Sequence, residues 1–580
     1  MTTMDKRRKY VHLCRRSGRA SLDMVRLQKT FMKTLALVGG VAVCGLAAAQ
    51  FDGPSPLAWR WQQPSTVASN GAPLIEGDTI YINLGSRSYA VDRATGNTKW
   101  KFPQGLPFEG LIRRSPIKIG DTLILQTDQK KIFGINPDNG SIKWTYNAPF
   151  SLTSQAVAVG KFLTFAMEGS NLMTIDSSTG EAIYSDPYKL LDGITGQLNS
   201  DGRDGVLFFD NQNNLKSVSI TSKKVSWKQP FQTKPIDGSV AITGGYAYVY
   251  SGTFLVALNV FSGNIKFQQP MPEAMVFSPE VGAGYILATT REGKVYSFDE
   301  SGNMRNKKAV VLGSQPLFKP VVVGKKFVVA TANGAINLVD PISSEVQWSY
   351  FIRPMNEAAR TPGDSTGTAG GPGSSGKGGG PGGQGLGGGQ GLGAGQGAGA
   401  GAGAGANNQN QVVTTLFASA SAALAGKTLL VPASDGSLLA FNAQDGVDLT
   451  GPIVKQNYPN PGDLIPGSNG QEFVFRIEDD GSGVNYGATA VDIDGRPYTF
   501  EFGRDGYLTF MISSSKKNMN LSDGRHVINV TVKDWMGNET KQSFYIRVDN
   551  TLQVRMRNQK DTNSGGLGGP GGGSGGSKGG

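Results

Sequence analysis

Residues 89–100, with the sequence YAVDRATGNTKW, predict the fold, because the chain repeats this stretch. An apolar residue (Val91) precedes Asp92, the following loop ends at Gly96, and an aromatic residue (Trp100) stands four positions later. The same frame returns at residues 135–144, 175–184, 218–227, 258–267, 298–302, 339–348 and 441–446. The copy at residues 298–302 lacks the aromatic residue, and Ser344 replaces the glycine in the seventh copy. Eight copies about 39–44 residues apart, leaving out one insertion, predict β-propeller blades of four strands each.

Each position of the repeat has a predicted structural role. An Asp or Asn side chain can accept hydrogen bonds from backbone amides two residues later, which starts a turn. The glycine supplies the positive φ angle that a tight hairpin loop requires. The aromatic residue is expected on an outer strand, where its ring fills the wedge between neighbouring blades. The motif therefore predicts the fold and indicates little about chemistry.

The quoted repeats also resemble a known family. AVDRATGNTKW (residues 90–100) and TIDSSTGEAIY (174–184) are similar to the repeat of the pyrroloquinoline quinone (PQQ)-like propellers, which carry a tryptophan-docking pattern. That family includes quinoprotein dehydrogenases and the non-catalytic propeller lipoprotein of the outer-membrane β-barrel assembly machinery. The resemblance covers about residues 57–450 and implies an eight-bladed propeller. Because both branches share the repeat, it leaves the activity open.

The last blade of the propeller is expected to take a strand from the N-terminal end of the chain. Residues 57–62 resemble the outer strands of other repeats, whereas the eighth repeat has Thr450 where others carry Trp or Tyr. Residues 57–62 are therefore predicted to complete the last blade and to close the ring. The propeller would then comprise residues 57–355 and 412–450.

Composition restricts the function classes. The net charge of +11 is concentrated in residues 1–49, which hold ten Lys and Arg against two acidic residues, and about +3 remains for the rest. We therefore expect no nucleic-acid binding. The cysteines are Cys14 and Cys44, and His526 is the single histidine beyond His12, which argues against a later disulfide, a thiol nucleophile or a His-rich metal site.

Residues 1–49 are predicted to form a signal-peptide region. Lys33 precedes the run TLALVGGVAVCGLAAAQ, which predicts cleavage after Ala49 and a true start at Met24 or Met32. The apolar run is short for a membrane span, so none is expected in the mature protein. The protein should be exported to the periplasm or the cell surface. A lipid anchor on Cys44 is a less favoured alternative, because a bulky valine precedes that cysteine.

Two glycine-rich segments stand apart from the repeats. Residues 363–405 contain 23 glycines, so the insertion 356–411 is predicted to be a disordered, flexible tether between blades seven and eight. Silk-like stacking of its Gly-Ala run is an alternative. The tail 551–580, in which residues 565–580 contain 11 glycines, is predicted to be disordered as well.

Residues 455–550 predict a separate β-sandwich of short alternating strands. The segments DGSGVN (480–485) and DGRHVINVTVKDWMGN (523–538) resemble bacterial immunoglobulin-like domains, which commonly act as spacers or binding modules. His526 is expected to be a half-exposed strand residue. Asp479, Asp480, Asp492 and Asp494 could be calcium ligands, because hard cations prefer clustered carboxylates, but a role in turns is favoured.

The sequence therefore predicts an all-β, exported, non-catalytic propeller protein that acts as a protein-binding scaffold or adaptor in the cell envelope. No catalytic, cofactor-binding or metal-binding residue is assigned. A PQQ-dependent dehydrogenase of alcohols or sugars is the main alternative, and a surface glycan-binding protein is a further one. The resemblance implies that such dehydrogenases typically hold PQQ under a ring of adjacent cysteines beside calcium and a carboxylate. No cysteine follows Ala49, which favours the scaffold.

Overall fold

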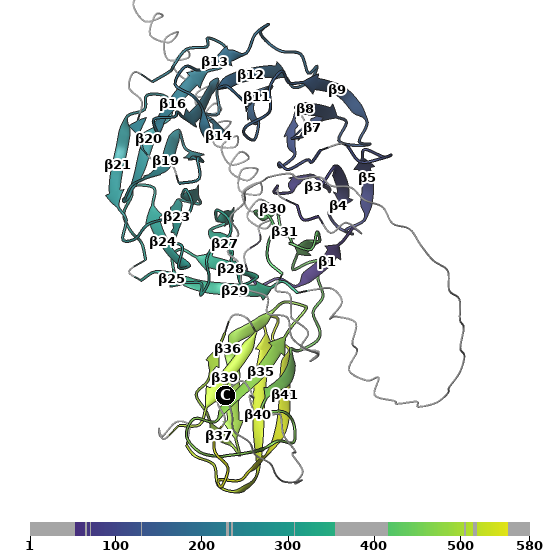
Figure 1. The fold of residues 1–580 in the computed structure, drawn as a ribbon, viewed down its shortest axis with the longest axis vertical. Coiled ribbons are helices and arrows are strands. Elements are labelled where there is room, and N and C mark those ends of the chain that lie inside the picture. The colour runs from purple at the N-terminus through teal and green to yellow at the C-terminus, as the bar shows by residue number, and fades with distance from the viewer. Residues whose placement is uncertain are drawn as a thin grey trace, which may run out of the picture. The chain divides into compact units, whose positions relative to one another are not determined.

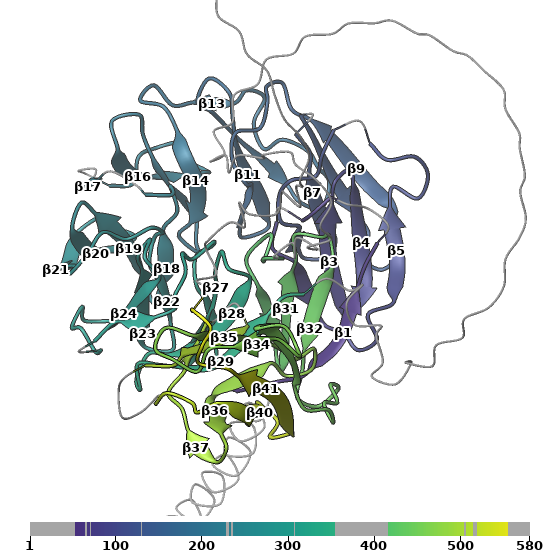
Figure 2. The ribbon, with the colours of Figure 1, turned by 60° about the horizontal axis from the view of Figure 1, so that its bottom comes forward.

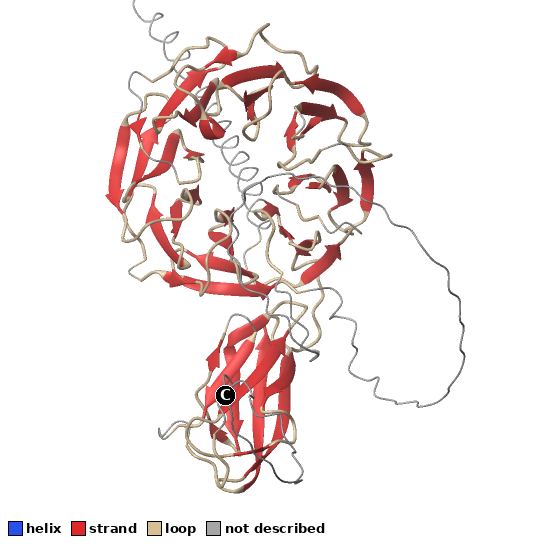
Figure 3. Ribbon diagram, viewed as in Figure 1, coloured by secondary structure: helices blue, strands red, loops and turns tan. Residues whose placement is uncertain are grey.

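The computed structural model describes residues 51–353 and 416–554, except residues 52, 64–66, 70, 109, 129, 228–230, 234–235, 307, 504–505 and 514–518. Over these residues the chain forms strands and loops without a helix (Figure 3). Accordingly, none of the described segments is a helix suited to crossing a membrane. The predicted signal-peptide region 1–49, the glycine-rich insertion 356–411 and the tail from residue 555 onward lie outside the described residues.

Eight antiparallel four-stranded sheets follow one another along the described part of the chain (Figure 1). Sheet 1 comprises β2 (Leu74–Glu76), β3 (Thr79–Leu84), β4 (Arg87–Asp92) and β5 (Thr98–Phe102). Sheet 2 comprises β6 (Ile117–Ile119), β7 (Thr122–Gln126), β8 (Lys131–Ile135) and β9 (Ile142–Asn147). Sheet 3 comprises β10 (Val157–Val159), β11 (Phe162–Met167), β12 (Asn171–Asp176) and β13 (Tyr188–Lys189). Sheet 4 comprises β14 (Thr195–Ser200), β15 (Gly205–Phe209), β16 (Asn214–Ser219) and β17 (Phe231–Gln232).

The later sheets repeat this order of strands. Sheet 5 comprises β18 (Ala241–Thr243), β19 (Tyr246–Ser251), β20 (Phe254–Asn259) and β21 (Ile265–Pro270). Sheet 6 comprises β22 (Glu280–Gly282), β23 (Tyr285–Thr289), β24 (Lys294–Asp299) and β25 (Val310–Val311). Sheet 7 comprises β26 (Val321–Val323), β27 (Lys326–Ala330), β28 (Ala335–Asp340) and β29 (Glu345–Phe351). Sheet 8 comprises β30 (Ala423–Ala425), β31 (Thr428–Pro432), β32 (Leu438–Phe441) and β1 (Leu57–Trp61).

The N-terminal strand joins the last of these sheets. β1 pairs antiparallel with β32, with Trp59 opposite Ala440 and Trp61 opposite Leu438, and β1 lies beside β32 in Figure 2. The prediction that residues 57–62 supply the outer strand of the last repeat is therefore confirmed. This pairing covers the hydrogen-bonding edge of β32.

Hydrophobic clusters hold each sheet against the sheet before it and the sheet after it. Sheets 7 and 8, for example, share a cluster that contains Leu338, Trp348 and Phe441. A further cluster, with Trp61 and Ile80, joins sheet 8 back to sheet 1. In Figure 1 the sheets follow one another around a circle, which is consistent with a β-propeller.

The repeated motif has the predicted geometry. Oδ1 of Asp92 accepts hydrogen bonds from the amides of Ala94 (3.1 Å) and Thr95 (3.0 Å). Gly96 has a φ of +72°, and a Cβ there would lie 2.9 Å from the ring of Trp59. The indole N–H of this tryptophan donates to the backbone carbonyl of residue 93 at 2.9 Å. The aromatic residue of one sheet thus docks on the turn of the next repeat, as expected from the sequence.

Two further sheets follow the ring and enclose a core of their own. The first comprises β33 (Ile453–Tyr458), β35 (Glu472–Glu478), β39 (Tyr507–Met511) and β38 (Glu501–Phe502). The second comprises β34 (Leu464–Ile465), β41 (Glu539–Val548), β40 (Gly524–Asp534), β36 (Val484–Ile493) and β37 (Arg496–Pro497). Their shared core includes Phe473 and Phe475 of one sheet and Ile528 and Val530 of the other. We call this pair of packed sheets the C-terminal sandwich.

Candidate functional site

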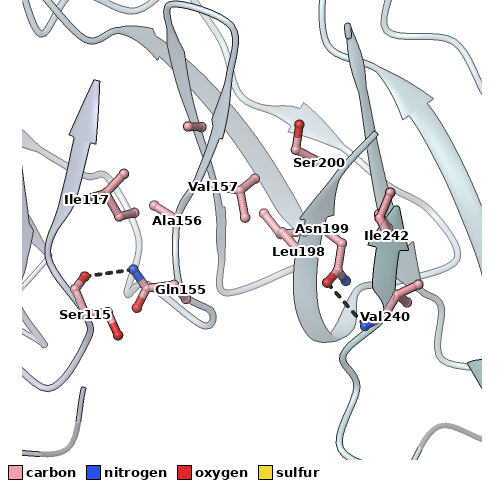
Figure 4. A pocket seen from close by; sticks show the side chains of 11 residues that line it. Ser115, Ile117, Gln155, Ala156, Val157, Leu198, Asn199, Ser200, Val240 and Ile242 are labelled. Carbon is pink, nitrogen blue, oxygen red and sulfur yellow. Dashed lines mark hydrogen bonds between the residues drawn. The ribbon is translucent and has the colours of Figure 1, made fainter. Parts of the chain in front are cut away.

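The described chain offers an open pocket among the inner strands of the ring (Figure 4). It has a volume of about 430 Å³ and is lined by Ser115, Ile117, Gln155, Ala156, Val157, Ala158, Leu198, Asn199, Ser200, Val240 and Ile242. These residues belong to β6, β10, β14 and β18 or directly precede them. The pocket therefore lies along four consecutive inner strands.

The polar side chains of this pocket are amides and hydroxyls. Nε2 of Gln155 donates to the carbonyl of Ser115 at 3.0 Å, and Oδ1 of Asn199 accepts from the amide of Val240 at 3.2 Å (Figure 4). Each bond connects one sheet to the next and fixes the amide group. Among the described residues of the lining, apolar side chains lie between these amides and none of the side chains is ionisable. Such a surface is suited to binding apolar and neutral polar groups.

Some of the exposed apolar side chains lie on the connections that enter these inner strands, and others, such as Phe261 and Ile342, lie in turns that precede the outer strands. In an up-and-down sheet of four strands, every connection from an outer strand to the next inner strand leaves on the same face, which we call the connection face. Among the described residues, six of the eight such connections carry an exposed large apolar side chain: Val67, Leu106, Phe150, Leu191, Ile236 and Phe417. Leu106 and Leu191 are 88% and 92% exposed. We call these six side chains the apolar rim. The pocket reaches the same face at Ser115, Gln155 and Ala156, which lie just before β6 and β10.

A second candidate site is a cluster of three carboxylates at the C-terminal sandwich. One carboxylate oxygen each of Asp448, Asp479 and Asp534 lies within 4.8 Å of the other two. Asp448 follows β32 of sheet 8, Asp479 follows β35, and Asp534 ends β40. Gly481 makes room for this approach, because a Cβ there would lie 2.3 Å from Cγ of Asp448.

The cluster is partly satisfied by backbone and amide donors. Oδ2 of Asp448 accepts from the amide of Ser482 at 2.7 Å, and Oδ2 of Asp479 accepts from the backbone amide of residue 483. Asn538 donates to both oxygens of Asp534, from its backbone amide at 2.8 Å and from Nδ2 at 2.6 Å. These donors orient the three carboxylates without neutralising their charge.

Burial opposes ionisation of two members of this cluster, Asp479 and Asp534. Burial and then the carboxylate of Asp448 raise the pKa of Asp479 to about 7. Burial also raises the pKa of Asp534, with Asp448 again adding to the effect. Three close carboxylates can hold a hard divalent cation such as calcium, or they can remain partly protonated.

The structure separates the four aspartates considered from the sequence. Asp479 joins the cluster, whereas Asp480 pairs with Arg353, with 3.6 Å between its Oδ1 and a guanidinium nitrogen. Asp492 accepts from the side-chain amide of residue 529 at 2.9 Å, and Asp494 contacts the imidazole of residue 526. Asp480, Asp492 and Asp494 thus take part in local contacts.

The expectation that His526 is half-exposed was wrong, because its side chain is buried. Nδ1 lies 2.6 Å from Oδ2 of Asp494, and Nε2 lies 2.7 Å from the carbonyl of Ser522. Its position at the start of β40 suggested exposure, but the turn that holds Asp494 covers it. Both ring nitrogens are engaged in these structural contacts.

Sequence reasoning missed Asp448 and Asp534. Asp534 begins the turn DWMGN, whose spacing to Asn538 indicates a turn-forming acid. Asp448 lies in a connecting segment that contains no copy of the repeated motif, 31 residues before Asp479 in the sequence. No local pattern relates these three positions, so their meeting depends on the tertiary structure.

Comparisons with known proteins relate the chain to solved structures and to one family. The structure of BamB from Moraxella catarrhalis is 16% identical, covers 50% of this chain and 91% of its own, and has a TM-score of 0.40. A europium-containing methanol dehydrogenase is 13% identical over 51% of this chain and 80% of its own, with a TM-score of 0.43. The computationally designed Ika8 protein is 8% identical over 68% of this chain and 99% of its own, also with a TM-score of 0.43.

The curated proteins include no match to this chain. A family model described as outer membrane protein assembly factor BamB matches residues 57–229 and 211–369. The two matches together span more than half of the 580 residues and include most of the repeats described above. The chain therefore belongs to the family of the outer membrane protein assembly factor BamB.

Proposed function

We propose that this protein is an exported, non-catalytic scaffold that binds protein partners in the cell envelope. In this proposal sheets 1 to 8 are the blades of one eight-bladed propeller, and the C-terminal sandwich is an immunoglobulin-like domain. The observation that carries the proposal is the apolar rim of the connection face. Membership of a family described as an outer membrane protein assembly factor supports it.

Exposed apolar surface is unfavourable in water, and a bound protein partner would bury it. Leu106 and Leu191 lie in separate connections and are almost fully exposed. Burying a leucine side chain contributes about 1.5–3 kcal/mol, so two of them could anchor a partner. The pocket adds fixed amide groups at Gln155 and Asn199, which could accept or donate further hydrogen bonds. A preformed rim of this kind binds with little ordering cost.

The dehydrogenase alternative requires a place for PQQ and its calcium. The described residues that line the pocket include no carboxylate and no cationic side chain, so they do not suit an anionic quinone with a bound cation. The three-carboxylate cluster lies outside this pocket, beside the C-terminal sandwich. The residues present therefore fit the scaffold better.

A pair of substitutions tests the proposal. Leu106→Glu combined with Leu191→Glu places two charges on the connection face, and Ile342→Glu is the matched control. Ile342 is 62% exposed and lies in a turn on the opposite face. After chemical cross-linking in the native envelope, the double variant should lose its cross-linked partner proteins, and the control should keep them.

Equal cross-linking of the double variant and the control would contradict the proposed binding face. The same preparations, supplied with PQQ and calcium, are assayed by dye reduction with alcohols and aldoses. Turnover in that assay would favour the dehydrogenase instead.

A further inference from the structure

The aromatic residue of sheet 7 docks differently from those of the other sheets. In five repeats an aromatic side chain donates a hydrogen bond to a backbone carbonyl in the turn of the next repeat. The donor and the acceptor lie 33 to 37 residues apart in the sequence. The donors are Trp59, Trp100, Trp144, Tyr184 and Trp227. Trp348 of β29 instead donates to the carbonyl of Ser482 at 2.8 Å, 134 residues away. Its partner belongs to the C-terminal sandwich.

The turn that Trp348 would reach by analogy is already covered. Gly446 is the glycine of the eighth repeat, and a Cβ there would lie 2.8 Å from Cγ of Pro56. The segment just before β1 therefore lies on the glycine that accepts an aromatic ring in other repeats. Residues 479–483, between β35 and β36, take the role of the turn for Trp348. We call these residues the clasp loop.

The clasp loop contacts both sheets of this seam. On sheet 7, the hydroxyl of Tyr350 donates to the carbonyl of Asp480 at 3.4 Å. On sheet 8, the amide of Leu57 in β1 donates to the carbonyl of Gly481 at 3.1 Å. Sheets 7 and 8 are thus joined through three consecutive carbonyls, those of residues 480, 481 and 482.

Backbone packing makes this contact close. Gly483 has a φ of +88°, and a Cβ there would lie 2.8 Å from the carbonyl oxygen of Ser349. Next to it, the indole of Trp535 donates to the same carbonyl at 3.2 Å and packs against the core shared by sheets 7 and 8. Arg353 adds a bond to the carbonyl of Ile477 at 3.2 Å. The sandwich therefore packs one of its side chains, Trp535, against the core shared by sheets 7 and 8.

The clasp loop contacts the two neighbouring sheets that the chain connects least directly, sheets 7 and 8. Sheets 7 and 8 are separated in sequence by residues 352–422, the longest connection between two successive sheets, and sheet 8 takes its outer strand from the N-terminal side. Short connections hold the other neighbours together, whereas a long one contributes little to keeping its ends in contact. We infer that the C-terminal sandwich is a clasp that closes the ring at this seam, with Trp348 as its anchor.

The inference is tested in the full-length protein with two matched variants. Trp348→Phe removes the indole donor that reaches the clasp loop, and Trp100→Phe removes the equivalent donor to the carbonyl of Pro137 in an ordinary repeat. Hydrogen exchange of the backbone amides is followed by mass spectrometry. Loss of the clasp bond should speed exchange in β30–β32 roughly fivefold to tenfold, since a single hydrogen bond is worth about that factor. Trp100→Phe should speed exchange in sheets 1 and 2 and leave β30–β32 unchanged.

Calorimetry gives a second readout. The unmodified protein should unfold the ring and the sandwich in one transition, and Trp348→Phe should separate it into two. Trp100→Phe should lower the melting temperature without splitting the transition. Two independent transitions in the unmodified protein, or equal exchange effects of the two variants on β30–β32, would overturn the clasp. Should Trp348→Phe fail to fold, Trp535→Phe provides the same comparison at the edge of the contact.

Discussion

Replacing Asp479 by asparagine should stabilise the protein at neutral and alkaline pH. The side chain is buried, with a pKa raised from 3.8 to about 7 by burial and by the neighbouring carboxylate of Asp448. An asparagine side chain would keep a similar volume and an oxygen that accepts the amide of Gly483, but it could not ionise. The substitution therefore removes the cost of a buried charge and little else.

The sign and size of the effect follow from the two pKa values. Below pH 3.8 the carboxyl is neutral in the folded and unfolded states, so the charge costs nothing. As the pH rises toward 7, the unfolded state releases its proton while the folded state keeps it, and the stability falls. Above pH 7 the full cost is reached, about 4 kcal/mol, because one pKa unit corresponds to about 1.4 kcal/mol.

Urea unfolding followed by tryptophan fluorescence measures this effect, with a chelator present throughout. Asp479→Asn should exceed the unmodified protein in unfolding free energy by about 4 kcal/mol at pH 8 and by close to zero at pH 4. Asp480→Asn is the matched control, since this exposed partner of Arg353 should contribute less than about 1 kcal/mol. An asparagine variant that is less stable than the unmodified protein at pH 8 would refute the reasoning. When the chelator is then replaced by millimolar calcium, stabilisation of the unmodified protein alone would show that the carboxylates hold a cation.

Three further predictions concern the ring, the sandwich and the insertion. Gly140→Ala should cost about 1–3 kcal/mol in thermal unfolding, because the glycine has a φ of +70° and a Cβ would lie 2.8 Å from the ring of Trp100. Gly160→Ala, at a φ of +61° with open space around it, should cost less, and equal losses would contradict a role for the ring contact. His526→Leu should lose about 2 kcal/mol in urea unfolding, since Asp494 and the carbonyl of residue 522 lose their shared partner; an unchanged midpoint would show that these contacts are not stabilising. Deleting residues 363–405 should change the unfolding free energy by less than about 1 kcal/mol, and a loss of cooperative unfolding would contradict the tether hypothesis.

The repeating part of this protein could be predicted from its amino-acid sequence. The motif around Asp92, Gly96 and Trp100 contains a turn, its glycine and the ring that docks on the next turn. All of its partners lie within one repeat or in the next, so the pattern recurs along the chain and can be recognised without a structure. The same regularity allowed β1 to be assigned to the last sheet, because its aromatic residues match the outer strands elsewhere.

The tertiary structure alone decided the contacts that no repeat encodes. Trp348 occupies the same position in its repeat as Trp100, yet its indole reaches the clasp loop, because Pro56 covers the glycine of the eighth repeat. The three clustered aspartates come from separate segments, and only the packing of the sandwich brings their carboxylates together. His526 is buried by a turn 32 residues earlier in the chain. Such contacts join elements that do not recur along the chain, so the repeated motif cannot predict them.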